Sequence, residues 1–197
     1  MISFINISTQ EPYSKFLSLY DSAHQSDQRN IEAACISSIS FENKPNARFV
    51  NIKYLDQKYF IFFSNYNSQK ADDFTNNNFV SLSFFWNSTQ TQIRISGVIK
   101  KTEKKYSDDH WKTRNIKKNA LAYSSKQSKM INSFEKVKEK YSDTLVNSDL
   151  SKRPEYWGGY KILPNRFEFW QGQENRLNKR ELYILKGNNF HKYFLEP

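Results

Sequence analysis

The chain consists largely of short β-type segments joined by short polar connections, and this pattern restricts the possible folds more than any other feature. Apolar or alternating stretches occupy Ala33–Ser40, Ala47–Tyr54, Tyr59–Ser64, Phe79–Trp86, Gln92–Lys100, Tyr156–Leu163, Phe167–Gln171, Leu182–Leu185 and Phe190–Leu195. Parallel strands need long crossover connections, usually helices, and few connections here are of that kind. The pattern therefore predicts a mainly β (α+β) fold, an antiparallel barrel or sandwich with peripheral helices.

One pair of these segments predicts a β-hairpin. Ala47–Tyr54 alternates between two sets of side chains, and a polar turn at Asp56-Gln57-Lys58 separates it from Tyr59–Ser64. Successive side chains of a strand point to opposite faces of its sheet. Arg48 and Lys53 are therefore expected on different faces, unless a bulge lies between them.

Helical signals are fewer. Glu11–Gln25 has Pro12 at its start and apolar residues at helical spacing. Ser68 and Ser107 are predicted N-caps of helices over Ser68–Phe74 and Ser107–Ala122, and Asn132–Tyr141 is a further predicted helix. The 197 residues suffice for one sizeable core and contain no linker. We expect one domain over 1–197, with an N-terminal helical segment at 1–30 and C-terminal strands at 150–197.

The charge of the chain predicts an anionic partner. The formal net charge of +10 would attract nucleic acid, a membrane surface or a phosphorylated ligand, although a bias toward Asn, Lys and Ile would also produce it. No apolar run approaches the ~20 residues of a membrane span, and the start lacks a signal sequence. The expectation is a soluble, cytoplasmic protein without a membrane partner. The single cysteine, Cys35, excludes an intramolecular disulfide.

Several common chemistries have no sequence support. The three histidines and one cysteine lie far apart, and GxGxxG, GxxxxGK[ST] and GxSxG motifs are absent. Zinc, P-loop and triad enzymes are therefore disfavoured, and no metal site is expected. Arg, Lys, Gln and Ser do occur near strand ends, interleaved with aromatic residues. This distribution suits a flat aromatic cofactor with a phosphate, and it equally suits single-stranded nucleic acid.

The C-terminal motifs distinguish these alternatives. Trp157-Gly158-Gly159, Phe167-Glu168-Phe169-Trp170-Gln171-Gly172 and Arg176-Leu177-Asn178-Lys179-Arg180 closely resemble the signature of the pyridoxamine 5′-phosphate oxidases. The resemblance continues upstream through Arg48-Phe49-Val50-Asn51-Ile52-Lys53, Phe63-Ser64-Asn65, Ser68-Gln69-Lys70, Gln92 and Ser125-Lys126-Gln127-Ser128. It covers the chain in register from about residue 13 to the end.

This resemblance implies a split β-barrel homodimer that binds two FMN molecules at the subunit interface. In this family a hydride passes from C4′ of pyridoxine or pyridoxamine 5′-phosphate to the flavin, and oxygen reoxidises the flavin to give hydrogen peroxide and pyridoxal 5′-phosphate. The flavin carries the redox chemistry, and the protein supplies position and electrostatics. Nucleic acid is then a disfavoured partner.

The resemblance also implies roles for individual residues. The residues expected to bind FMN are Arg48, Phe49, Val50, Lys53, Phe63, Ser64, Lys70, Gln92, Gln127, Ser128, Trp170 and Arg180. The residues expected to bind substrate are Lys53, His110, Arg114, Lys118, Arg176 and Asn178, with Arg176 over the substrate ring as the catalytic residue. Arg180 near the flavin would stabilise negative charge on the reduced ring.

Four positions depart from the family pattern and leave alternatives open. Gln69 replaces an Arg, His110 a Tyr, Lys118 a Ser and Asn178 a His, and the chain begins close to its first helix without the family's basic arm. One alternative is an FMN oxidoreductase for another substrate, as in phenazine-biosynthesis relatives. Another is a non-catalytic module that binds flavin or pyridoxal phosphate. A nucleic-acid binder would instead show affinity that falls steeply with salt and is indifferent to FMN.

Overall fold

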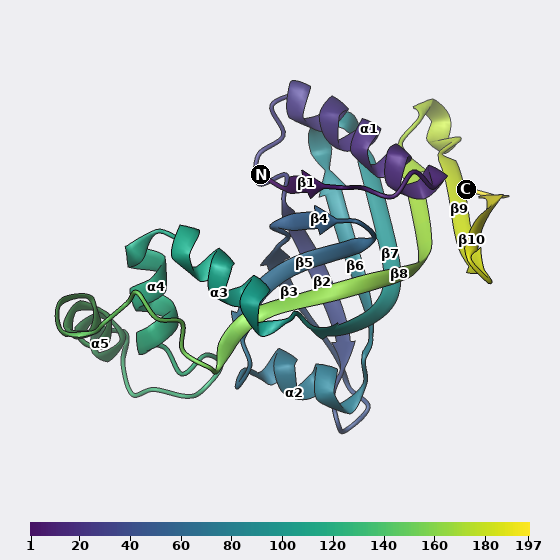
Figure 1. Ribbon diagram of the computed structural model, residues 1–197. Coiled ribbons are helices and arrows are strands. Elements are labelled where there is room, and N and C mark those ends of the chain that lie inside the picture. Colours follow the sequence, from purple (N-terminus) through teal and green to yellow (C-terminus); the bar gives the residue numbers. More distant parts are fainter.

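One curved sheet of ten strands forms the centre of the molecule (Figure 1), seen in a computed structural model that describes residues 1–197. The strands are β1 (Ser3–Ile5), β2 (Ala33–Ile39), β3 (Pro45–Asn51), β4 (Tyr54–Asp56), β5 (Tyr59–Asn65), β6 (Phe79–Trp86), β7 (Thr91–Lys101), β8 (Trp157–Gln171), β9 (Lys179–Lys186) and β10 (Asn189–Leu195). The helices are α1 (Glu11–Gln25), α2 (Gln69–Asn76), α3 (Lys104–Thr113), α4 (Ile116–Ser124) and α5 (Phe134–Asn147). None of these helices is both long and apolar enough to cross a membrane.

The strand order confirms the expected antiparallel fold. The main path runs β1-β4-β5-β8-β7-β6-β2-β3, and β9 and β10 extend from β8. Every pairing is antiparallel except that of the three-residue β1 with β4. The long strand β8 pairs with β5 through its first residues, with β9 through its last, and with β7 along most of its length. Strand β8 therefore connects the part of the sheet that contains β5 with the part that contains β9 and β10.

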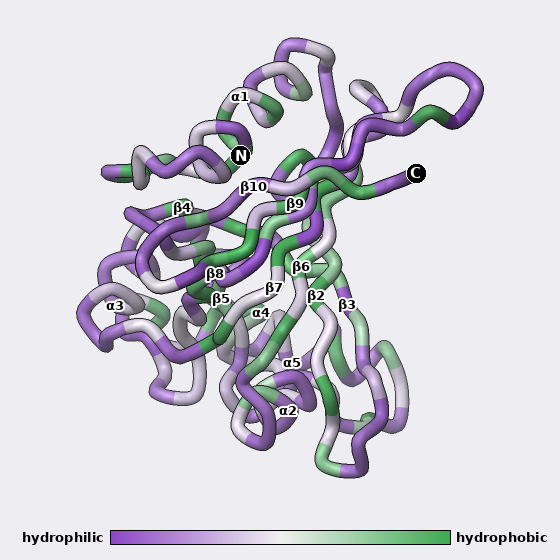
Figure 2. The backbone as a smooth tube through the Cα atoms, turned by 90° about the vertical axis from the view of Figure 1, so that its right-hand side faces the viewer, coloured by the Kyte–Doolittle hydropathy of each residue, from purple (hydrophilic) through white to green (hydrophobic).

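Helix α1 covers the apolar side of the sheet, above the strands in Figure 1. Its buried side chains include Tyr13, Phe16 and Tyr20 at helical spacing, as predicted from Glu11–Gln25. The Phe16 ring meets Phe60 and Phe84 at centroid distances of 5.0 and 5.4 Å. Figure 2 shows the hydrophobic stretches lying mainly along the strands. The core is thus an aromatic layer between α1 and the sheet.

The predicted hairpin between Ala47–Tyr54 and Tyr59–Ser64 is wrong in its pairing. Strand β3 pairs with β2, and only Tyr54–Asp56 pairs with the start of β5. The chain changes partners at two residues, where the Ile52 N–H donates to Glu32 O and the Lys53 N–H donates to Ile61 O. Lys53 therefore lies beyond the end of β3, and the simple alternation from Arg48 does not reach it.

The predicted helix over Ser107–Ala122 is two helices. The chain breaks at Arg114 and Asn115, where the Asn115 side chain accepts a hydrogen bond from the Lys117 N–H and caps α4. Ser107 lies inside α3 instead of capping it, and its hydroxyl accepts the Gly159 N–H. The next helix, α5, runs from Phe134 to Asn147 and not over Asn132–Tyr141.

The predicted strands Tyr156–Leu163 and Phe167–Gln171 form the single strand β8. The register between β7 and β8 shifts between Ser96 and Gly97, so Asn165 has no partner in β7. Pro164, which has no N–H to donate, lies at this β-bulge, where its missing hydrogen bond is tolerated. At this bulge the two backbones come very close. A Cβ on Gly97 would lie 2.3 Å from Leu163 O.

Replacing Gly97 with alanine is therefore expected to destabilise the fold. The added methyl group would meet a backbone carbonyl that cannot move without disturbing the β7–β8 pairing, so we expect a loss of about 1–3 kcal/mol in the free energy of unfolding. Urea denaturation measures this loss. Gly172→Ala is the comparison, because the nearest atoms to its Cβ would be side-chain atoms of Gln90 and Trp170 at 3.2 Å and not a backbone carbonyl at 2.3 Å. Equal unfolding midpoints for the two variants would contradict this account of Gly97.

Candidate functional site

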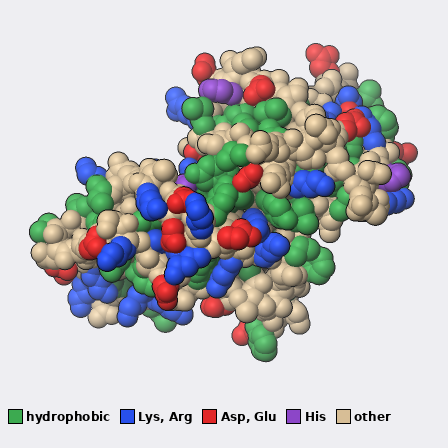
Figure 3. All heavy atoms as spheres, viewed as in Figure 1, with side chains coloured by type: hydrophobic (Ala, Val, Ile, Leu, Met, Phe, Trp, Pro, Cys, Tyr) green, Lys and Arg blue, Asp and Glu red, His purple; other side chains and the backbone are tan.

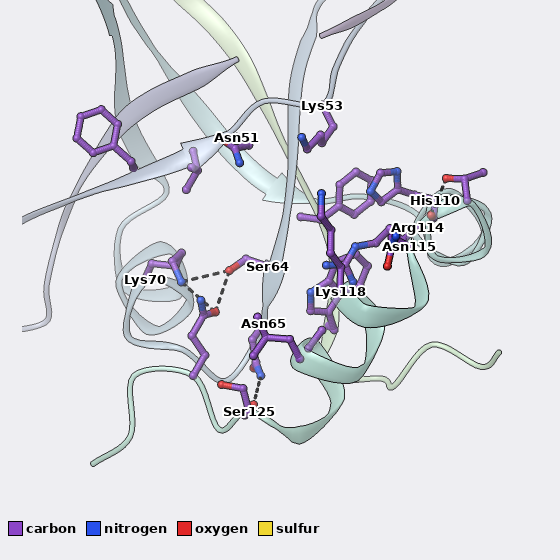
Figure 4. Close-up of a pocket in the computed structure, with 18 residues that line it drawn as sticks. Asn51, Lys53, Ser64, Asn65, Lys70, His110, Arg114, Asn115, Lys118 and Ser125 are labelled. Atoms are coloured by element: carbon purple, nitrogen blue, oxygen red, sulfur yellow. Dashed lines mark hydrogen bonds between the residues drawn. The ribbon is translucent and has the colours of Figure 1, made fainter. Parts of the chain in front are cut away.

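A cavity of ≈ 690 Å³ opens between β3, β5, α2 and the α3–α4 pair (Figure 4). This volume lies in the range of small-molecule and cofactor sites. Its lining contains many of the residues expected to bind FMN or substrate: Phe49, Val50, Lys53, Phe63, Ser64, Lys70, His110, Arg114, Lys118 and Gln127. The lining also contains residues to which no binding role was assigned from the sequence, namely Asn51, Asn65, Thr113, Asn115, Leu121, Ala122, Ser125 and Trp157.

One side of the cavity holds the buried ammonium group of Lys70. Lys70 is only 7% exposed. The Lys70 Nζ atom lies 3.2 Å from Ser64 Oγ, 3.0 Å from Ser68 Oγ and 3.2 Å from Gln127 Oε1. Burial and the nearby Arg48 lower the pKa of Lys70 to about 8. All the hydrogen-bond acceptors are neutral, and no carboxylate forms an ion pair with it. The N-terminus of α2, which begins at Gln69, adds a positive dipole end, so this side suits an anion.

The other side of the cavity carries a second group of basic side chains. Figure 4 shows Lys53, His110, Arg114 and Lys118 apart from Lys70 and Ser64. The Arg114 guanidinium lies 4.4 Å from the centroid of the Trp157 ring and donates to Asn119 Oδ1 at 3.0 Å. Burial lowers the pKa of Arg114 to about 10. Lys53 is half-buried, 3.7 Å from Glu32, and Lys118 is exposed. The basic character of this side also suits an anion.

The His110 imidazole lies flat against an aromatic wall between these groups. Its ring stacks on Phe63 with a centroid distance of 3.7 Å and an interplanar angle of 12°. Phe63 is itself parallel to Trp157 at 5.4 Å. Burial, followed by the charges of Arg114 and Lys53, lowers the pKa of His110 to about 4. The imidazole is therefore neutral at pH 7, and the aromatic wall lies between two basic sides of the cavity.

Arg48 lies near the cavity but is already engaged. Its Nη2 is 3.0 Å from Asp73 Oδ2 and its Nη1 is 2.6 Å from Ser38 Oγ. Asp73 also accepts hydrogen bonds from Ser38 and Asn46. Burial alone would raise the pKa of Asp73, but these hydrogen bonds and the charge of Arg48 outweigh burial and hold the pKa below its usual value. Arg48 is absent from the cavity lining, and its expected role in binding FMN stays a prediction.

A second cluster lies on β7, β8 and β9. The register places Gln92 beside Trp170 and Trp170 beside Arg180, so three of the predicted cofactor residues are neighbours. Glu168 on the same face is buried and pairs with Arg180 at 2.8 Å, with Arg166 at 3.0 Å and with Arg94. Sequence analysis missed Arg94, Arg166 and the role of Glu168. The sequence did contain a signal for this cluster, because Arg94 alternates with Ile93 and Ile95 in one predicted strand and Glu168 with Phe167 and Phe169 in another.

The two clusters occupy opposite ends of β8. Trp157 lines the cavity and Trp170 lies in the second cluster, thirteen residues farther along the strand, which corresponds to roughly 40 Å of extended chain. Arg176 and Asn178 lie next to the second cluster, in the exposed turn before β9. Ser128 is exposed beside Gln127, outside the lining. Within one chain the structure therefore brings together only part of the predicted site.

The molecular surface argues against a continuous basic groove on the face shown in Figure 3. Lys and Arg side chains there are interspersed with Asp and Glu over the middle of the molecule. Ion pairs on and around α3 include Lys105–Asp109, Arg153–Asp108 and Lys161–Glu103. A single-stranded nucleic acid needs an uninterrupted positive track, and this face does not supply one.

Two family models match the chain. One, described as pyridoxamine 5′-phosphate oxidase, matches residues 21–143, and the other, described as the pyridoxine 5′-phosphate oxidase C-terminal dimerisation region, matches residues 157–197. A pyridoxine/pyridoxamine 5′-phosphate oxidase of Colwellia psychrerythraea is 36% identical over 84% of this chain and 77% of its own. A protein named pyridoxine/pyridoxamine 5′-phosphate oxidase 2, of Hydrogenovibrio crunogenus, is 35% identical over 98% of this chain and 91% of its own.

Solved structures confirm the expected split barrel. PhzG from Burkholderia lata, solved in complex with tetrahydrophenazine-1-carboxylic acid, superposes with a TM-score of 0.91 at 24% identity, covering 95% of this chain and 93% of its own. An FMN-binding protein of Nostoc punctiforme, related to pyridoxamine 5′-phosphate oxidase, gives a TM-score of 0.79 at 12% identity, covering 96% and 100%. At these identities the likeness establishes the fold alone.

Lys70→Met is expected to stabilise the ligand-free protein while weakening its affinity for phosphate. Lys70 is charged in both the folded and the unfolded state below pH 8, so the full cost of burying the ammonium is present there. That cost disappears as the pH rises from about 8 toward the ordinary value of 10.5, because the folded protein then loses its proton first. The variant should gain roughly 2 kcal/mol at pH 7 and should lose the rise in stability above pH 8.

Urea denaturation at pH 7 and pH 9, together with titration of inorganic phosphate, measures both effects. Lys58→Met is the control, because Lys58 is an exposed lysine in the turn between β4 and β5. A Lys70→Met protein that is less stable than the wild type at pH 7 would contradict the conclusion that burial of the Lys70 ammonium costs more than its hydrogen bonds and the charge of Asp73 return.

Proposed function

This chain belongs to the pyridoxamine 5′-phosphate oxidase family, and on that premise we propose that it is an FMN-dependent oxidase of pyridoxine or pyridoxamine 5′-phosphate. The product is pyridoxal 5′-phosphate, and oxygen is the final electron acceptor. The observation that carries the proposal is one cavity with two separate cationic sides and an aromatic wall between them. Such a cavity suits two flat molecules that each carry a phosphate.

The Lys70 side is the proposed site of the FMN phosphate. The Lys70 ammonium has only neutral oxygens as hydrogen-bond partners, so a phosphate would provide its missing counter-charge. The residues present therefore fit the phosphate of FMN. Ser64 and the N-terminus of α2 would hold the same phosphate, and Gln127 would contact the flavin. When bound, FMN supplies the acceptor for the substrate hydride.

The side formed by Lys53, Arg114 and Lys118 is the proposed site of the substrate phosphate, with His110 as its neutral member. Arg114 is held by Trp157 and Asn119, so its guanidinium is oriented before the substrate arrives. Phe63 and Trp157 make one flank of the cavity apolar, and charge pairing is stronger beside an apolar surface than in bulk water. These residues bind and orient the substrate.

A second subunit is proposed to complete the site. Three residues expected to bind FMN, Gln92, Trp170 and Arg180, lie at the far end of β8 from Lys70 within one chain. The C-terminal residues 157–197 match a dimerisation region, and they include Trp170, Arg176 and Arg180. In a homodimer the far end of one β8 would meet the cavity of the partner, and Arg176 and Asn178 would arrive with it.

An FMN oxidoreductase with a different substrate is the second candidate. The observation that favours it is the composition of the substrate side, where His110 and Lys118 replace the hydroxyl-bearing residues of the family pattern. An added ammonium would pair with a carboxylate as readily as with a phosphate. PhzG, which shares the fold, was solved with a bound carboxylic acid.

The first experiment is anaerobic absorption spectroscopy of the FMN-loaded protein. Addition of pyridoxamine or pyridoxine 5′-phosphate should bleach the flavin band, and admission of oxygen should restore it. A yellow protein that bleaches with neither compound would overturn the substrate assignment and favour the second candidate or a non-catalytic flavin-binding module. A protein that does not retain FMN would overturn the cofactor assignment.

Heterodimers test whether the site is shared between subunits. Lys70→Glu and Arg180→Ala homodimers should each lose FMN, but a heterodimer of the two variants has one site with both changes and one site with neither. The heterodimer, isolated with two different affinity tags, should therefore bind about one FMN per dimer. Sites built within single subunits would leave every site damaged, and the heterodimer would bind none.

A further inference from the structure

Tyr54 makes a contact with the candidate site from outside the cavity. Its hydroxyl oxygen lies 2.8 Å from His110 Nδ1, and its ring meets the His110 ring edge-on at 5.4 Å. His110 lines the cavity, whereas Tyr54 does not. The Nδ1 edge of the imidazole therefore faces away from the cavity, and the edge that carries Nε2 is the one available to a ligand.

The hydrogen bond determines where the proton of the neutral imidazole resides. Burial raises the pKa of the Tyr54 hydroxyl against the opposing effect of the nearby Thr113 hydroxyl, so the Tyr54 hydroxyl keeps its proton. Thr113 donates its own hydrogen to His110 O, whereas His110 Nδ1 lies 2.8 Å from the Tyr54 oxygen and is the acceptor for its hydrogen. A partly buried hydroxyl that did not donate would leave its hydrogen unpaired, at a cost of about 1–3 kcal/mol. Tyr54 therefore donates to Nδ1, and the imidazole proton lies on Nε2.

We propose that Tyr54 is a positioning residue that fixes His110 as a neutral N–H donor toward the anionic group bound beside Lys53 and Arg114. The proposal rests on the proposed function only for the identity of that anion. The opposite tautomer would place a lone pair at Nε2, facing the oxygens of the ligand, and would repel them. The stack on Phe63 fixes the plane of the ring, and Tyr54 fixes which nitrogen carries the proton.

With Tyr54 behind it, His110 offers a neutral N–H donor at the position where the family pattern has a Tyr hydroxyl. The replacement therefore keeps a hydrogen-bond donor and adds no charge. Lys53, Arg114 and Lys118 already surround the anion, and Glu32 is the acidic group paired with Lys53. A protonated His110 would add a fourth positive charge next to Arg114. A neutral imidazole with a fixed tautomer supplies a directed hydrogen bond and leaves the electrostatics to the lysines and the arginine.

Tyr54→Phe is the test, and Tyr106→Phe is its matched control. Tyr106 packs edge-on against Tyr54 at 5.8 Å, and its buried hydroxyl has no hydrogen-bond partner, so its removal should leave His110 unchanged. The readout is ¹H–¹⁵N NMR of the imidazole nitrogens in the FMN-loaded protein. The chain has only three histidines, and a His110→Gln variant identifies the signals of His110.

In the wild type, the His110 signals should correspond to the Nε2–H tautomer. In Tyr54→Phe they should shift toward a mixture of tautomers, the affinity for inorganic phosphate should fall about three- to tenfold, and KM for pyridoxine 5′-phosphate should rise by a similar factor. The loss falls on KM more than on kcat, because the hydrogen bond holds the bound group. The Tyr106→Phe control should match the wild type in all three measurements.

The outcomes separate this inference from the proposed function. An unchanged His110 tautomer in Tyr54→Phe, or an equal change in Tyr106→Phe, would overturn the role of Tyr54. A changed tautomer with weakened phosphate binding would support the role even if neither pyridoxine nor pyridoxamine 5′-phosphate bleached the flavin. In that case only the identity of the substrate would be wrong.

Discussion

The continuity of β8 is the constraint on which the rest of the structure depends. This strand is hydrogen-bonded to β5, β7 and β9, and it runs from the cavity wall at Trp157 to the charged cluster around Glu168. It passes Pro164 without ending because the bulge opposite Gly97 removes the need for a proline N–H. A break in β8 at this point would disconnect the cavity from the charged cluster, and it would also divide the sheet.

The candidate site contains two cationic side chains, Lys70 and Arg114, that form no ion pair within the chain. Lys70 and Arg114 both have lowered pKa values because burial disfavours their charged forms. Elsewhere in the molecule buried charges are compensated, as Glu168 is by three arginines and Asp73 by Arg48, Ser38 and Asn46. The contrast supports the cavity as the proposed ligand site, because Lys70 and Arg114 have no carboxylate partner there and an anionic ligand would supply one.

Sequence analysis predicted the elements whose signals are local. Helix α1 has the predicted bounds because Pro12 and the spacing of Phe16 and Tyr20 act within one segment. Lys53, Ser64, Lys70 and Arg114, to which the family resemblance assigned binding roles, line one cavity. It did not predict features that depend on distant partners. The change of pairing at Ile52 requires β2 and β5 on either side, and the pairing of Arg48 with Asp73 requires α2 to fold against β2 and β3. The contact of Tyr54 with His110 likewise joins residues from two elements far apart in the sequence.

The placement of the two clusters at opposite ends of β8 links assembly to ligand retention. If each complete site spans two subunits, a lone subunit offers the phosphate cradle at Lys70 without the ring contacts from Trp170 and Arg180. Cofactor affinity would then depend on protein concentration, since dilution that separates the subunits also takes each site apart. Conversely, bound flavin would hold the subunits together, and the holoprotein would tolerate dilution at which the apoprotein dissociates. Cellular flavin supply would then influence the quaternary structure of this protein as well as its activity.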